Sequence, residues 1–244
     1  MKRTNDTPFT LEAAQPLRFG AVTSYALSIV TFITLCLAMI AVPISGAHAP
    51  GGGISYPYLE TVGQFPRDYL WQYSALIMAV LYAIQAAVIA AGVRPEKKIY
   101  ANIGLVFSIM VSLILFVNYY VQVSVVPVSL MSGETAGIPL LTQYNPHGVF
   151  IAMEELAFSL MLIPFLALVK VFDCRTRTCA AIRILFGAAV IISAAAFIYL
   201  SIRFGLDRKD RYEVVVISVT WLTLIVNSLL IARVFRAAAI QKGA

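Results

Sequence analysis

Two adjacent carboxylates, Glu154 and Glu155, interrupt a long apolar stretch in the second half of the sequence. Only 14 residues separate Glu155 from Lys170, and as a helix they span roughly 21 Å of a hydrocarbon layer that is roughly 30 Å thick. A helix that crosses a membrane here must therefore include residues before Glu155. This places both carboxylates at or inside the apolar boundary, where they are costly unless protonated, paired or hydrated.

A carboxyl group at that depth can bind and release a proton, or act as a general acid or base. Asn145 is a favourable N-cap and Pro146 suits the first position of a helix. In such a helix His147 lies two turns before Glu154, on the same face. The candidate catalytic residues are therefore His147, Glu154 and Glu155. The alternative is that these side chains reach the headgroups or only join neighbouring helices.

Other polar and aromatic residues are expected at the same depth, where they could line one outward-facing pocket. Hydrogen bonds between helices and interfacial tyrosines are the alternative explanation for several of them. The candidate ligand-binding residues are Trp71, Gln72, Tyr73, Asn118, Tyr119, Tyr120, Gln122, Glu134 and Tyr144.

Adjacent helical residues point about 100° apart, so Glu154 and Glu155 cannot both face one partner. We expect Glu154 to be the one that faces the interior of the bundle. Its expected partner is a polar group of the preceding span, with three candidates: Asn118, Tyr119 or Gln122.

The composition is that of a membrane protein. Of the 244 residues, 60% are hydrophobic and 12% are charged, and the mean hydropathy is +0.85. A soluble domain carries about twice that share of charge. The net charge of +6 does not indicate nucleic acid as a partner, because the Lys and Arg residues lie in short loops between apolar blocks.

The apolar blocks predict an all-α polytopic membrane protein, a bundle of six transmembrane helices. A single transmembrane domain is expected over residues 20–235, between cytoplasmic tails at residues 1–19 and 236–244. Pro164 is expected to kink the fourth span. The predicted spans are residues 20–42, 69–93, 99–126, 146–171, 180–202 and 212–234.

The loop charges predict the orientation. Thirteen of the 18 Lys and Arg residues fall on the side of the two termini. The positive-inside rule then places both termini in the cytoplasm and the protein in the cell membrane. Cys174 and Cys179 fall in a cytoplasmic loop, where unpaired thiols are expected.

The expected partners are the lipid bilayer and a small solute or lipid-like ligand. Small-residue faces on spans two and five allow a homo-oligomer. No cofactor or metal is predicted, because two histidines, His48 and His147, are too few for a metal centre without carboxylates to complete it.

Three functions stay open from the sequence. The first is a small-solute or proton-linked transporter, with Glu154 or Glu155 as the titrating group. The second is a membrane-embedded enzyme that uses Glu as general acid or base on a lipid or isoprenoid. The third is an accessory subunit without an activity of its own, whose polar groups only hold helices together.

Overall fold

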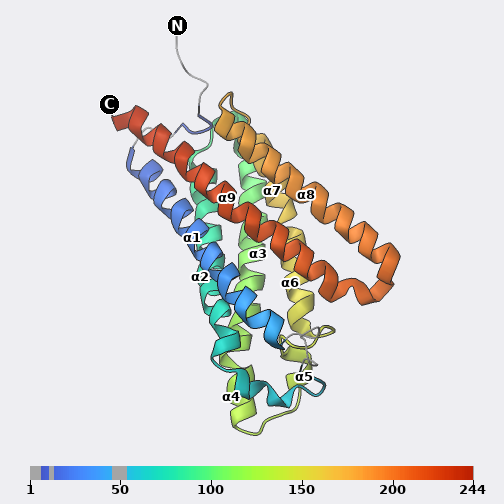
Figure 1. Cartoon of the computed structure of the whole chain (residues 1–244). Coiled ribbons are helices and arrows are strands. Elements are labelled where there is room, and N and C mark those ends of the chain that lie inside the picture. The colour runs from blue at the N-terminus through green and yellow to red at the C-terminus, as the bar shows by residue number, and fades with distance from the viewer. Residues whose placement is uncertain (1–6, 11–13, 46–53, 244) are drawn as a thin grey trace.

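The structure is a computed structural model that describes residues 7–10, 14–45 and 54–243. Within these ranges six helical segments are long and apolar enough to cross a membrane. The start of α1 (Ala14–Ser45) and the end of α9 (Lys209–Gly243) lie at one end of the bundle, here called the terminal end (Figure 1). The opposite, distal end carries the short helices α4 (Val126–Met131) and α5 (Ile138–Leu141). The prediction of an all-α bundle of six spans is confirmed.

Seven helices build the six spans. They are α1 (Ala14–Ser45), α2 (Leu70–Gly92), α3 (Lys98–Ser124), α6 (Val149–Leu160), α7 (Leu162–Val171), α8 (Arg177–Phe204) and α9 (Lys209–Gly243). Short 3₁₀ helices lie at η1 (Leu59–Gln64), η2 (Arg67–Tyr69), η3 (Pro95–Lys97) and η4 (Gly205–Arg208). The first helix thus begins six residues before the predicted span, and the last continues to Gly243.

The fourth span is broken, as Pro164 predicts. It consists of α6, which ends at Leu160, and α7, which begins at Leu162. Proline has no N–H to donate to the carbonyl four residues earlier, so the helix cannot continue straight through this position. The break separates the carboxylate-bearing part of the span from its apolar terminal part.

The start of the fourth span differs from the prediction. The helix begins at Val149 with Gly148 as its N-cap, and no side chain caps it. Asn145 instead organises the preceding turn: its Oδ1 accepts from the His147 amide at 2.9 Å, and its Nδ2 donates to the Pro139 carbonyl at 2.6 Å. The expectation that His147 shares a helix face with Glu154 is therefore wrong, since His147 precedes the helix.

The first and last spans lie side by side. α1 packs against α9 and α2, and α2 packs in turn against α3 (Figure 1). On the other side of the bundle α3 contacts α6 and α7, and α6 also contacts α9. This order brings α3, α6 and α9 together in the distal half, where the candidate site lies.

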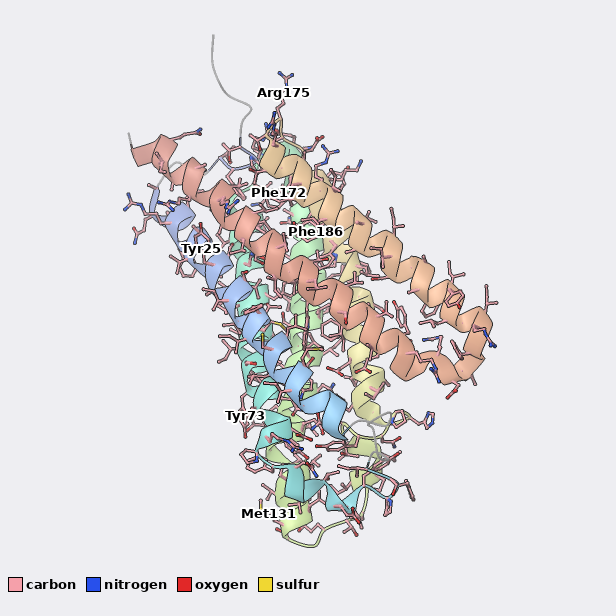
Figure 2. The ribbon with its side chains drawn as sticks, in the orientation of Figure 1. Tyr25, Tyr73, Met131, Phe172, Arg175 and Phe186 are labelled. Atoms are coloured by element: carbon pink, nitrogen blue, oxygen red, sulfur yellow. A yellow bond between two sulfur atoms is a disulfide. The ribbon has the colours of Figure 1, made fainter. Side chains whose placement is uncertain are left out.

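The segment before α1 docks onto the terminal end. Phe9 is 5% exposed, and its ring stacks on Phe235 of α9 with centroids 4.2 Å apart. The edge of the same ring meets Phe172, which Figure 2 labels near the terminal end of the bundle. Backbone hydrogen bonds also join residues 8–10 to residues 92–94. This segment thereby ties the end of α2 to α9.

The loop between α7 and α8 contains a disulfide. Cys174 and Cys179 are bonded, with their Cα atoms 5.8 Å apart. Thr176 caps α8 by accepting from the Cys179 amide at 3.2 Å, which turns the chain back toward Cys174. The expectation of two unpaired thiols is therefore wrong. Disulfides are rare in the cytoplasm, so this bond and the loop charges point to opposite sides of the membrane.

Candidate functional site

Three side chains from three helices form a buried cluster in the distal half. Glu154 of α6 is 1% exposed, and its Oε1 accepts a hydrogen bond from the Tyr119 hydroxyl of α3 at 2.7 Å. The side chain of Glu213 of α9, which is buried as well, interacts with that of Glu154. Glu154 faces the interior and bonds a polar group of the third span, as predicted. We call Tyr119, Glu154 and Glu213 the carboxyl cluster.

The pairing of two carboxyl groups defines the chemistry of this cluster. Carboxylates accept hydrogen bonds and cannot donate them, so two of them bond to each other only when one carries a proton. Loss of this proton changes the contact, because two neighbouring negative charges repel strongly in a medium of low dielectric constant. In the described residues Glu154 forms no ion pair with a Lys or Arg.

Aromatic rings enclose the carboxyl cluster. The Trp71 ring meets that of Tyr119 edge-on at 5.3 Å and lies 6.1 Å from Trp221. Phe150 and Phe158 pack against the same tryptophans. The indole N–H groups of Trp71 and Trp221 are buried without a hydrogen-bond partner in the protein. The site thus combines a carboxyl pair, two free indole donors and apolar walls.

Glu155 belongs to a different contact. Its Oε1 accepts from the Arg208 guanidinium at 2.6 Å, and this guanidinium lies 4.4 Å from the centre of the Phe197 ring. One turn further along α6, the hydroxyls of Ser159 and Tyr212 are 3.3 Å apart. These contacts join the start of α9 to α6. The two adjacent acids, Glu154 and Glu155, therefore contact different residues.

Several predicted site residues form a hydrogen-bonded group of polar side chains at the distal end, here called the polar cap. Tyr144 donates its hydroxyl to Asp68 at 3.0 Å, and Gln72 donates to Gln143 at 2.7 Å. Gln122 accepts from the Gln143 amide at 3.0 Å. Asp68, Gln72 and Gln122 come from the ends of spans, while Gln143 and Tyr144 belong to the loop before α6. The cap thus fastens that loop across the distal end.

The remaining predicted site residues lie apart from the cluster. Asn118 is buried, but it donates to the Phe150 carbonyl at 3.1 Å and so joins α3 to α6. Tyr73 and Tyr120 are 43% and 56% exposed, and Figure 2 shows Tyr73 on the outside of the bundle. His147 and Glu134 are also exposed. The structure does not bring these four exposed residues together with Glu154.

Two members of the site were not singled out from the sequence. Glu213 lies one residue inside the predicted sixth span, so the depth argument made for Glu154 applies to it too. Trp221 lies eight residues further along, about two turns, and so on the same face as Glu213. The sequence signal that could have identified Glu213 and Trp221 is an acid and a tryptophan on one face of an apolar span.

A metal centre is not indicated by the described residues, since no group of three or more His, Cys, Asp or Glu lies close enough together to hold an ion. Compared with known proteins, the chain matches no family model, no curated protein and no solved structure.

Proposed function

We propose that this integral membrane protein is a proton-linked transporter of a small solute and that the Glu154–Glu213 pair is its proton-binding group. One observation carries the proposal: two buried carboxyl groups from different spans interact with each other in helices apolar enough to cross the membrane. Ionisable residues in such positions mark proton and substrate pathways. A pair that served only to join helices would work as well with neutral amides.

The pair also offers a way to couple protonation to movement. With one proton present, Glu154 and Glu213 attract and hold α6 against α9. Without it, two negative charges repel across the same contact, which favours separation of the two helices. Proton binding thereby shifts the equilibrium between two arrangements of the bundle, as a proton-linked carrier requires. The Tyr119 hydroxyl, which donates a hydrogen bond to Glu154, stabilises the charged form of that carboxyl group.

The proposal is tested by detecting the shared proton in the purified full-length protein. Infrared difference spectra should show a carboxylic-acid C=O band that disappears as the pH is raised and shifts in heavy water. Intrinsic fluorescence should change over the same pH range, because both tryptophans of the chain enclose the cluster. A protein without such a band at any pH at which it stays folded would leave the pair as a structural contact and refute the proposal.

The orientation is proposed from the loop charges, with both termini in the cytoplasm. In a Cys36→Ser variant, a membrane-impermeant maleimide should not label this protein in intact cells, even after treatment of the cells with an impermeant reductant. Permeabilised and reduced cells should be labelled at Cys174 and Cys179, because both then become accessible thiols.

Glu134→Cys in the same background provides the positive control. Glu134 is exposed at the distal end, so the new thiol should be labelled in intact cells. Labelling of Cys174 or Cys179 in intact cells after impermeant reduction would place the termini outside.

A further inference from the structure

The disulfide between Cys174 and Cys179 closes a short loop at the terminal end of the bundle. Its two cysteines differ in exposure: Cys174 is partly exposed, whereas Cys179 is 0% exposed. Cys174 lies just beyond the end of α7, and Cys179 lies in the first turn of α8. A thiol that approaches from solution therefore meets the sulfur of Cys174 first, and Cys179 is the sulfur that is released when the bond breaks.

The charge around this disulfide is positive. Arg175 and Arg177 lie between the two cysteines and are both exposed, and Figure 2 shows Arg175 at the terminal end, pointing away from the bundle. The acid beside the disulfide, Asp173, pairs with Arg183 at 2.7 Å and with Lys97 at 3.8 Å. Neither Arg175 nor Arg177 forms an ion pair with another residue that the structure describes. The loop thus offers two guanidinium groups to an anionic molecule that approaches the disulfide.

The position of Cys179 favours its release as a thiolate. Although its side chain is buried, Cys179 lies in the first turn of α8, where backbone N–H groups and the helix dipole stabilise negative charge. Arg177 in the same turn adds a positive charge. Exchange is faster when the leaving sulfur is a more stable thiolate. The fold therefore sets both the sulfur that is attacked and the sulfur that leaves.

The disulfide and the loop charges are compatible if the bond is reversible. The charges place this loop in the cytoplasm, where stable disulfides are rare. The loop nevertheless holds the two cysteines at a bonding separation, with their Cα atoms 5.8 Å apart. Disulfides that do occur in the cytoplasm are usually transient and either catalytic or redox-sensing. A pair that alternates between two thiols and a disulfide satisfies both observations.

We propose that Cys174 and Cys179 form a redox-active site that exchanges with an anionic cytoplasmic thiol of the glutathione class. This inference is independent of the carboxyl pair and rests on the cytoplasmic orientation proposed above. A first thiolate attacks the Cys174 sulfur, the disulfide breaks, and its electron pair passes to Cys179, which takes up a proton.

A second thiolate then attacks the sulfur of the thiol bound to Cys174. Cys174 leaves as a thiolate and takes up a proton, and the two small thiols depart as one disulfide. In total two small thiols are oxidised, and the disulfide of the protein is reduced to two thiols. The same steps in reverse oxidise the protein with the disulfide form of the small thiol.

The kinetic test uses the purified full-length protein with Cys36→Ser, because Cys36 is the free cysteine of the chain. The disulfide is reduced with glutathione, which is anionic, or with cysteamine, which is cationic, and the freed thiols are alkylated and counted by mass. The ratio of the glutathione rate to the cysteamine rate should be about tenfold lower in Arg175→Gln/Arg177→Gln, at the low end of electrostatic steering. High salt should lower the wild-type ratio as well.

Arg203→Gln/Arg211→Gln is the matched control. It also removes two exposed arginines, but from the distal ends of α8 and α9, so the ratio of rates should stay at the wild-type value. Equal ratios in the wild type and in Arg175→Gln/Arg177→Gln would overturn the anionic-thiol site. Reduction by a dithiol protein but not by glutathione would overturn it too.

The test in cells uses the Cys36→Ser protein, quenched with acid before its free thiols are alkylated. The pair should be reduced in untreated cells, oxidised after addition of diamide, and reduced again after its removal. A pair that stays oxidised in untreated cells would overturn the exchange. The carboxylic-acid band reports on the carboxyl pair and the impermeant maleimide on the orientation, so a failure of either of those proposals is seen separately.

Discussion

Glu154→Leu is expected to destabilise the protein strongly, whereas Glu154→Gln should fold normally and yet lose the shared proton. Leucine leaves the buried Tyr119 hydroxyl without its hydrogen-bond acceptor, at about 1–3 kcal/mol. A glutamine can still accept from Tyr119 through its oxygen and donate to Glu213 through its nitrogen. The two variants therefore separate the structural role of this side chain from its role in binding a proton.

The free energy of unfolding of the purified protein measures the first effect, and the carboxylic-acid band measures the second. Glu155→Gln is the matched control, because Glu155 pairs with Arg208 and a partly exposed ion pair contributes only about 0–1 kcal/mol. It should keep the band and nearly all of the stability. Equal stability of Glu154→Leu and the wild type would contradict the buried contact.

Gly20→Val is expected to disrupt the packing of the first span. A Cβ at Gly20 would lie 2.9 Å from the Phe235 ring of α9 and 2.9 Å from Val88 of α2. Phe235 cannot easily move away, because its other face stacks on Phe9. Overpacking of this kind costs about 1–3 kcal/mol for added methylenes, and a branched side chain between three helices should lie at or above the upper value.

Gly187→Ala is a control for which we expect the opposite change in stability. Gly187 lies inside α8, and a Cβ there meets no atom within 4 Å. Alanine should therefore stabilise the helix by about 0.5–1 kcal/mol through its higher helix propensity. Thermal unfolding in one detergent compares the two: the midpoint should fall for Gly20→Val and rise slightly for Gly187→Ala. An unchanged midpoint for Gly20→Val would show that α1 does not approach α9 this closely.

The number of spans and the depth of Glu154 could be predicted because both follow from one-dimensional properties. Span count depends on the length of apolar blocks, and the depth of Glu154 depends on counting residues to Lys170. The break at Pro164 follows from a local chemical property of proline. None of these needs knowledge of which helices are neighbours.

The partner of Glu154 could not be predicted in the same way. Glu213 meets it only because α6 packs against α9, and helix order is not encoded in hydrophobic periodicity. The error at His147 has a local cause, since Asn145 bonds the turn instead of capping the helix. The error at Cys174 and Cys179 came from inferring redox state from the expected compartment rather than from the geometry of the loop.

The contact between α1 and α9 has a consequence for biosynthesis. Ser28 of the first span donates to the Ile225 carbonyl of the last at 2.7 Å, and Phe9 stacks on Phe235. During translation, α1 therefore enters the bilayer long before its partner has left the ribosome. Its buried hydroxyls must meanwhile bond their own backbone or a helper protein. Completion of the bundle is thus a late event, and a nascent chain stopped before α9 offers the insertion machinery a first span that is still unpaired.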